Sequence, residues 1–537
     1  MSKKILFAEE ARKEIKIGVD AVANAVKITL GPSGRNVGMD KGWGNPMVTN
    51  DGISIAREIV LEDSIQNMGA SFCKEVAQKT NDQAGDGTST SIVLTQAILS
   101  EGLKKIAVGV NAMALRRGIE KASKLIIESL KSIAKPIKSE EEILQVATIS
   151  AESKEIGKVI SDTVAKLGKD AIITVEESPI SGIISETSMG MEIDKGFISP
   201  YMMTNQDRGE SEIKEAKILV TDLKIGAVQD ILPLLEQMVS LGKTELVIIA
   251  DDIVGESLHT LIINKIRGTF TALGIKAPGF GLRKRDYLED IATLVGATLI
   301  TSDLGMKLEN VKIEHLGSAD RIISNKEKTT IVGGKGNKEA VIQRVESIKK
   351  EIEKTESRHD VLKLEERIAK LQGTVAVIKI GGSTEVETKY LKLKLEDAVS
   401  AVKAALSEGI VPGGGIALIK SRQSIIKPED MTFDEELGFN IVCKAVEVPL
   451  QQIAINSGGG DGSGVVDRVI SMKNTPNGGY DALKGVYSDD LIKDGIIDPV
   501  KVTRSALENA VSTSGILLTL EVVMAEVKKE KNNLLDK

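Results

Sequence analysis

Aromatic side chains and cysteines are scarce in this 537-residue sequence. Aromatic residues make up 2% of the chain and Trp43 is the single tryptophan, which disfavours a stacking platform for single-stranded nucleic acid. Two cysteines, Cys73 and Cys443, are too few for a disulfide framework or a cysteine-based zinc site. The net charge of −7 argues against binding to a phosphate backbone. We therefore expect no nucleic-acid partner and a reducing compartment.

Long apolar runs are also missing. No stretch approaches the roughly 20 apolar residues of a membrane helix, and residues 246–250 have the length of a buried strand. Charged residues near the start leave no room for the apolar core of a signal peptide. We expect a cytoplasmic protein without a membrane partner.

Several enzyme signatures are absent too. The sequence has no Walker-type G-x-x-x-x-G-K-[ST] motif and no G-x-S-x-G motif. His259, His315 and His359 lie in unrelated contexts, and no histidine pair has metal-ligand spacing. A hydrolase triad and a histidine-bound metal are therefore not indicated.

The residues that are present divide the chain into helical and mixed regions. Apolar periodicity predicts helices over about 9–30, 65–84, 88–102 and 111–134, and short strands near 36–40 and 47–49. The centre alternates strands at 172–175, 218–220, 246–250 and 298–300 with helices at 230–240 and 256–267. A charged helical hairpin follows at 338–372, and helices resume after Thr384. This order predicts a multidomain α and α/β fold in which an inner domain is inserted into an outer one.

One glycine-rich loop stands directly before a helix, at residues 84–90. Its glycines would let a phosphate approach the backbone, the helix N-terminus would attract the anion, and Asp86 is a suitable Mg²⁺ ligand. A capped turn explains the same residues. The loop alone does not decide between these interpretations.

Other candidate positions are also ambiguous alone. The 29–35 loop is an ordinary helix stop, and glycines 413–415 could allow close packing. Asp51 is typical of a turn, and Asp397 of a helix surface.

Six segments in order resemble group I chaperonins over residues 5–525. Residues 29–37, 51–59 and 84–90 look like the ATP site, and 276–281, 413–415 and 498–507 are similar to other signatures of the family. The resemblance implies a mainly helical equatorial ATPase domain, a small α/β hinge domain and an α/β apical domain. Their expected boundaries are 1–133 and 408–525 for the equatorial domain, 134–188 and 376–407 for the intermediate domain, 189–375 for the apical domain, and 526–537 for a flexible tail.

The resemblance also implies a site for ATP, Mg²⁺ and K⁺. Asp86 matches the magnesium ligand, while Asp51 and Asp397 match the catalytic carboxylates that orient or activate the attacking water. Asp397 arrives from the intermediate domain, so hydrolysis would wait for hinge closure. The implied nucleotide contacts are Thr29, Leu30, Gly31, Pro32, Gly87, Thr88, Ser89 and Thr90 at the phosphates, Gly414 and Asp498 at the ribose, and Ala482 and Ile496 at the base.

The implied activity is ATP hydrolysis coupled to protein folding, an isomerase-type classification. Non-native proteins would bind an apolar rim and be enclosed under a GroES-like lid, in seven-membered homo-oligomeric rings paired as a double ring. Apolar stripes of this kind are more often core than surface. The implied client-binding residues are Phe197, Tyr201, Met202, Leu232, Leu235, Leu258, Ile262 and Ile263.

Four departures from the family pattern stand out. Asn50 replaces a lysine near the potassium site, and Asp481 replaces a base-contacting asparagine. Gln451 and Gly460 replace a charged pair between rings, and the tail lacks Gly-Gly-Met repeats. The ring count and the lid partner therefore stay open.

Two other functions are compatible with parts of this pattern. A small-molecule kinase would need a polar acceptor pocket, for which the sequence shows no cluster. A non-catalytic scaffold or adhesin would not need Asp51, Asp86 and Asp397 together.

Overall fold

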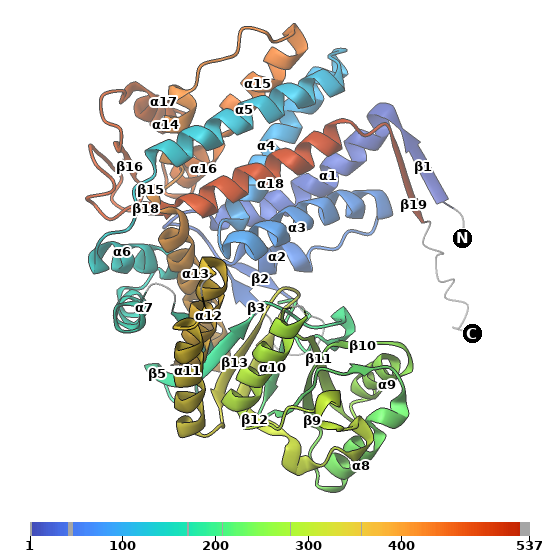
Figure 1. Ribbon diagram of the computed structural model, residues 1–537. Helices are drawn as coiled ribbons and strands as arrows, with labels where there is room; N and C mark the ends of the chain where they lie inside the picture. The colour runs from blue at the N-terminus through green and yellow to red at the C-terminus, as the bar shows by residue number, and fades with distance from the viewer. Residues whose placement is uncertain are drawn as a thin grey trace. The chain divides into compact units, whose positions relative to one another are not determined.

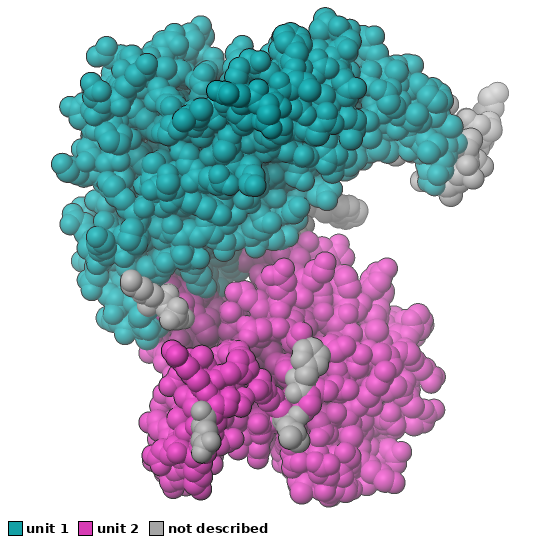
Figure 2. All heavy atoms as spheres, turned by 45° about the horizontal axis from the view of Figure 1, so that its top comes forward, with its two compact units in different colours: residues 1–169, 175–184, 379–537 teal, residues 170–174, 185–378 magenta. Residues whose placement is uncertain are grey.

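The computed structural model describes residues 3–40, 47–168, 171–206, 208–279, 281–355 and 357–526. The chain divides into two compact units, which Figure 2 colours separately. Unit 1 comprises residues 1–169, 175–184 and 379–537, and unit 2 comprises 170–174 and 185–378. Unit 2 is thus inserted in the sequence of unit 1, as the alternation of patterns predicted. The finer three-domain boundaries stay a prediction, and most of the tail lies outside the described residues.

Unit 1 is mainly helical (Figure 1). Its long helices pack around a core of buried aliphatic side chains, and α18 contacts α3, α4 and α5. Among the described residues, no helix combines the length and apolar character needed to cross a membrane. The helices are α1 (Ala8–Val26), α2 (Gly52–Glu58), α3 (Ser64–Ala84), α4 (Thr88–Ala107), α5 (Ala112–Ile133), α6 (Glu140–Ala151), α7 (Lys154–Leu167), α13 (Glu385–Glu408), α14 (Ile416–Ser424), α15 (Phe433–Ala445), α16 (Val448–Asn456), α17 (Ser463–Ser471) and α18 (Val500–Leu518).

Short antiparallel strand pairs join distant parts of unit 1. The pairing of β1 with β19 brings the start and end of the described chain together. Three further pairs lie beside the helices. The pairs are β1 (Lys3–Phe7) with β19 (Val522–Glu526), β2 (Val37–Met39) with β3 (Met47–Thr49), β15 (Ile410–Pro412) with β18 (Ile497–Pro499), and β16 (Gly479–Asp481) with β17 (Val486–Ser488).

Helices α1 and α3 approach each other so closely that only glycine fits at two crossing positions. A Cβ on Gly18 would lie 1.9 Å from the carbonyl oxygen of Gln66, and one on Gly69 would lie 2.1 Å from that of Ile15. Helix α3 begins at Asp63, whose side chain accepts hydrogen bonds from two backbone N–H groups, and ends at Gly85 in the left-handed region. The position of the 84–90 loop is therefore set by the packing of α1 on α3.

Unit 2 is built on a mixed sheet with the order β11-β9-β7-β12-β13-β5-β14-β4, and β6 pairs with β12. Strands β7, β9 and β11 are parallel, whereas β12 is antiparallel to β7 and β13. The strands are β4 (Ile172–Glu177), β5 (Gly182–Ile193), β6 (Ser211–Lys214), β7 (Lys217–Val220), β9 (Glu245–Ala250), β11 (Thr271–Lys276), β12 (Gly317–Ser324), β13 (Thr329–Gly334) and β14 (Thr374–Gly381), with a separate short pair β8 (Lys224–Ile225) and β10 (Asp252–Ile253). The helices are α8 (Leu232–Ser240), α9 (Gly255–Ile266), α10 (Leu282–Val295), α11 (Lys338–Ile352) and α12 (Arg358–Leu371).

Most of the predicted elements are present, including the helical hairpin, which is α11 and α12. The strand predicted at 298–300 is wrong. Ile300 makes an isolated parallel bridge to Thr221, and the side chain of Thr301 caps a 3₁₀ turn immediately afterwards. The chain therefore turns away before a ladder can form.

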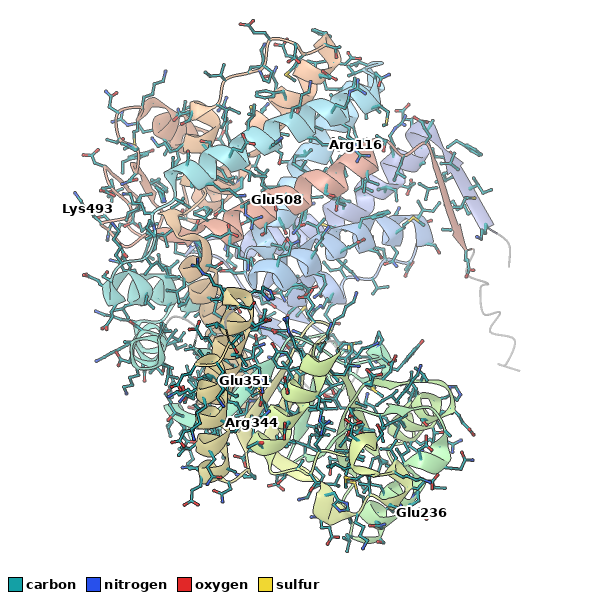
Figure 3. The ribbon with its side chains drawn as sticks, in the orientation of Figure 1. Arg116, Glu236, Arg344, Glu351, Lys493 and Glu508 are labelled. Atoms are coloured by element: carbon teal, nitrogen blue, oxygen red, sulfur yellow. The ribbon has the colours of Figure 1, made fainter. Side chains whose placement is uncertain are left out.

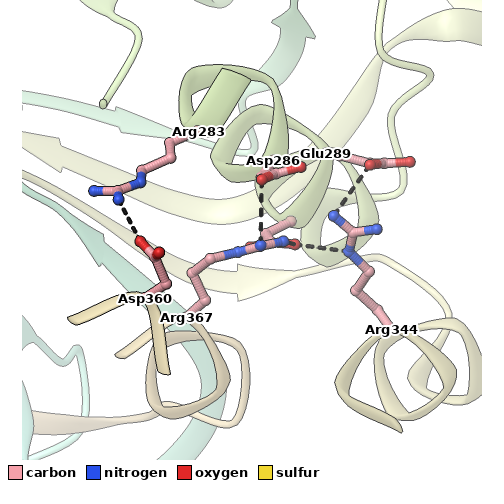
Figure 4. Close-up of polar contacts among 7 residues, drawn as sticks. Arg283, Asp286, Glu289, Arg344, Asp360 and Arg367 are labelled. Carbon is pink, nitrogen blue, oxygen red and sulfur yellow. Dashed lines mark hydrogen bonds and ion pairs between the residues drawn. The ribbon is translucent and has the colours of Figure 1, made fainter. Parts of the chain in front are cut away.

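The helical hairpin is held to α10 by a buried charge cluster (Figure 4). Asp290 is 2% exposed and accepts hydrogen bonds from Arg367 Nε at 2.7 Å and Arg344 Nε at 2.8 Å. Arg367 also lies 3.4 Å from Asp286. Burial alone would lower the pKa of Arg367, but the hydrogen bond that Arg367 donates to Asp290 and the charge of Asp290 raise it. Figure 3 labels Arg344 on the same hairpin helix as Glu351.

Replacing Asp290 by alanine is expected to lower the free energy of unfolding by about 3–5 kcal/mol, because two guanidinium groups lose their shared buried carboxylate. The urea midpoint followed by circular dichroism measures this loss. Asp360→Ala is the control, since it removes an exposed partner of Arg283 at the edge of the same hairpin. Equal midpoint shifts for the two variants would contradict the assignment of the hairpin's stability to Asp290.

Candidate functional site

The loop between α3 and α4 has the geometry of an anion site. Gly85 and Gly87 both lie in the left-handed region, with φ of 70° and 83°. Helix α4 begins at Thr88, and no side chain caps its N-terminus. The first-turn N–H groups of a helix lack intrahelical partners and carry partial positive charge, so they can bind a phosphate.

A second loop lies against this helix start. The short 3₁₀ helix η1 (Lys27–Thr29) leads into it, and Thr29 Oγ1 lies 3.3 Å from Ser89 Oγ. Gly52 approaches from α2, where a Cβ would lie 2.4 Å from Ser89 Oγ. The structure thus brings together the three segments whose motifs resembled an ATP site.

Asp51 is the N-cap of α2. Its Oδ1 accepts a hydrogen bond from the Ile53 N–H at 3.3 Å, and its Oδ2 accepts one from the Ser54 N–H at 3.0 Å. Asp51 therefore does cap a turn, as its sequence context suggested. Its carboxylate also interacts electrostatically with those of Asp86 and Asp397.

Helix α13, which contains Asp397, packs against the loop between α3 and α4. A Cβ on Gly85 would lie 2.2 Å from Ser400 Cβ, one turn beyond Asp397. The C-terminal end of α13 is tied to α18, because Arg504 Nε and Nη2 donate to the Glu408 carboxylate at 3.0 and 2.6 Å. Arg504 also pairs with Glu508, labelled in Figure 3.

Lys394, one turn before Asp397, is the cation beside these carboxylates. Its Nζ lies 2.7 Å from Glu152 Oε1, which also accepts a hydrogen bond from Asn50 Nδ2 at 3.4 Å. Glu152 adopts φ 53°, in the left-handed region that favours glycine. Burial lowers the pKa of Lys394, but the charge of Glu152 and its hydrogen bond raise it, so the ammonium form is favoured.

Asp498, on β18, is the fourth carboxylate of this cluster and interacts with Asp86. The N–H groups of Gly414 and Gly415 donate to its carboxylate, and a Cβ on Gly413 would lie 3.0 Å from its Oδ1. Burial and the charge of Asp86 raise the pKa of Asp498 to about 7, against the opposing effect of the two N–H groups.

The pKa values of Asp86 and Asp397 are also raised. Burial raises the pKa of Asp86 and so does the charge of Asp51, while the Gly87 N–H and Lys394 oppose this rise. Burial and the charges of Asp51 and Asp86 raise the pKa of Asp397 well above its ordinary value. A hard cation such as Mg²⁺ would relieve this repulsion, and carboxylate oxygens are the ligands it prefers. Among the described residues, no three carboxylate or histidine side chains could hold a metal ion by themselves, so the residues fit a divalent cation that takes one carboxylate ligand and shares the phosphates of a nucleotide.

A buried apolar cluster packs against the loop at Leu30. Leu30 and Ile496 pack against a cluster that contains Ala482 and Ile453. Asp481, the replacement for an asparagine, is engaged in its own turn, since its Oδ1 accepts from the Leu483 and Lys484 N–H groups at 3.0 and 3.1 Å. The predicted base and ribose positions are thus close to the predicted phosphate loop.

A family model identifies the family of this chain. Residues 22–528 match the model of the TCP-1/cpn60 chaperonin family. The chain belongs to this family. The chaperonin resemblance is therefore confirmed, while membership of the group I branch stays a prediction.

One solved structure similar to this chaperonin is the chaperonin gp146 from the bacteriophage EL 2 (Pseudomonas aeruginosa), crystallised in the presence of ATP-BeFx. The two are 21% identical, with a TM-score of 0.69, and the match covers 98% of this chain and 99% of gp146. The similarity shows that the multidomain helical and α/β fold is that of a chaperonin.

The predicted client-binding residues of this chaperonin lie in unit 2, but the structure exposes only some of them. Tyr201 is 71% exposed and Leu232 is 42% exposed. Leu232 shares the exposed face of α8 with Glu236, labelled in Figure 3. The other positions are half-buried at Leu258, Ile262 and Ile263, and buried at Phe197, Met202 and Leu235.

The last three positions require a correction. Phe197, Met202 and Leu235 belong to the aliphatic core of unit 2, and the Gly274 N–H donates to the Met202 sulfur. Side chains that fill this core do not form an exposed rim, so only the five other predicted positions are exposed or half-buried.

Asp498→Asn is expected to stabilise the protein, by about 2 kcal/mol more at pH 8 than at pH 5. A carboxyl group whose pKa rises from 3.8 to about 7 on folding holds its proton more tightly in the folded state. Ionisation of Asp498 therefore lowers the free energy of unfolding progressively as the pH rises from 5 to 8. Denaturant unfolding without nucleotide or Mg²⁺ measures the gain. A gain independent of pH would contradict the raised pKa.

Proposed function

We propose that this chaperonin is an ATP-driven protein-folding subunit of the group I type. The carrying observation is the electrostatic grouping of Asp51, Asp86 and Asp397 beside the start of α4, whose N-terminus has no side-chain cap. A scaffold would have no need for this costly cluster.

ATP would bind with its phosphates between the α4 start and the Thr29–Pro32 loop. Asp86 would hold Mg²⁺, and the backbone near Asn50 would hold K⁺. The ribose would lie near Gly414 and Asp498, and the base near Ala482 and Ile496. When bound, Mg²⁺ supplies charge neutralisation for phosphoryl transfer.

Asp51 and Asp397 would position the attacking water. The raised pKa of Asp397 suits proton acceptance. The α3–α4 loop is fixed by the packing of α1 on α3, whereas Asp397 lies on α13, so movement of α13 would complete or open the site. Hydrolysis would then wait for the conformational change.

Folding would follow from capture and enclosure of non-native chains. The exposed and half-buried apolar residues of unit 2, Tyr201, Leu232, Leu258, Ile262 and Ile263, would bind clients because such surface contacts unfolded chains without sequence preference. A GroES-like lid would close seven-membered rings of identical subunits, stacked as a double ring, in the cytoplasm. The matching classification is an isomerase-type ATP hydrolase.

Asp397→Ala is expected to retain ATP binding and lose at least about 100-fold of its turnover, because the residue acts on the reacting water. Calorimetric titration with Mg-ATP and a phosphate-release assay measure the two effects. Glu385→Ala is the matched control, since it removes a 75% exposed carboxylate from the same helix. Normal turnover in the Asp397 variant would refute its catalytic role.

Tyr201→Ser combined with Leu232→Ser is expected to reduce capture of a denatured test protein at least about fivefold, because exposed apolar area is lost. Suppression of aggregation of chemically denatured protein measures capture. Ile342→Ser removes a 58% exposed apolar side chain from α11 of the same unit and serves as the control. If both changes reduced capture equally, the client surface would not be the predicted one.

A further inference from the structure

We propose that Asn456 is a positioning residue that fixes the backbone of the phosphate loop, an inference that rests on the proposed nucleotide site. Asn456 is the last residue of α16. Its Nδ2 donates to the carbonyl oxygens of Lys27 at 3.0 Å and Leu30 at 2.8 Å. One side chain from a distant part of the sequence therefore holds both ends of the turn that leads into the loop.

The orientation of this amide is fixed. Gln452, one turn earlier on α16, donates from its Nε2 to Asn456 Oδ1 at 2.8 Å. The oxygen is thus satisfied by Gln452, and the two Nδ2 hydrogens match the two carbonyls. A reversed amide would place its oxygen against two carbonyl oxygens, so the network admits one arrangement.

The peptide plane between Leu30 and Gly31 has the orientation of a type II turn, and the alternative is the type I orientation. Leu30 has φ −74° and ψ 131°, and Gly31 has φ 86°, the values of the central residues of a type II turn. In a type I turn the same peptide plane is turned over, which glycine permits. The hydrogen bond to the Leu30 carbonyl oxygen selects between the two.

This selection decides which atom the loop offers to a phosphate. In a planar trans peptide the C=O and the following N–H point in opposite directions. Because Asn456 holds the Leu30 carbonyl toward α16, the Gly31 N–H points away from α16. The reversed plane would instead present a carbonyl oxygen, which repels a phosphate.

Packing on the same helix supports this arrangement. A Cβ on Gly31 would lie 3.0 Å from Ile453 Cγ2, so α16 leaves no room for a side chain at this position. Thr29 is fixed separately, by its Oγ1 hydrogen bond to the Val26 carbonyl oxygen at 2.8 Å. Asn456 therefore governs the Leu30–Gly31 peptide in particular.

The test uses Asn456→Asp, which places an oxygen against two carbonyls, and Asn456→Ala, which removes the donors without adding charge. The controls are Gln423→Glu and Gln423→Ala, because Gln423 Nε2 donates to the Ile470 carbonyl oxygen at 2.7 Å in the same unit. Calorimetry with Mg-ADP and steady-state ATP hydrolysis are measured on the full chain. Amide hydrogen exchange over residues 27–35 is followed without nucleotide.

Both Asn456 variants are expected to weaken Mg-ADP binding and raise the KM for ATP at least about tenfold, with kcat within about threefold, since uniform binding is lost. Exchange should quicken at residues 27–35 in these variants, while the controls should match the unaltered protein. Unchanged affinity in both variants would overturn the inference and leave the proposed function intact. Failure of the unaltered protein to bind nucleotide would overturn both.

Discussion

Repulsion among the carboxylates of Asp51, Asp86, Asp397 and Asp498 is the constraint around which unit 1 is organised. They come from the cap of α2, the α3–α4 loop, α13 and β18, and burial together with their neighbouring charges raises the pKa of Asp86, Asp397 and Asp498. Such a cluster is costly without a cation. Close packing of α1 on α3 and the Arg504 contacts of α13 hold the backbone in place against this repulsion. In the proposed function, a bound cation would offset the free energy lost here.

The sequence predicted those parts of the fold that depend on neighbouring residues. Helices with a regular apolar face, such as α3 and α5, were placed almost to the residue. Strands β5, β12, β13 and β14 were not predicted. Strand β5 is largely exposed and polar, and β13 ends in Gly333-Gly334, so neither shows the usual alternation. Their pairing is decided by distant partners.

In the candidate site, too, local motifs were recognisable in the sequence, whereas contacts between distant residues were not. Its loops carry recognisable motifs, and the structure brings Thr29, Gly52 and Ser89 together, while the roles of the site residues stay a prediction. Asn456 and Glu152 carry no local signal, because their role depends on contacts with residues far away in sequence. Leu235 lies in an apolar stripe, which is more often core than surface, and its burial is decided by core contacts with residues far away in sequence.

Helix α13 has a mechanical consequence. Its 24 residues end at Glu408, with Gly409 directly after them, and an α-helix rises about 1.5 Å per residue, so the helix is a rod about 36 Å long. Asp397 lies about halfway along it, about 18 Å from Gly409. If the rod pivots at Gly409, the tip at Glu385 travels about twice as far as Asp397. In such a movement the displacement of Asp397 is about half the displacement of Glu385 at the end of the helix.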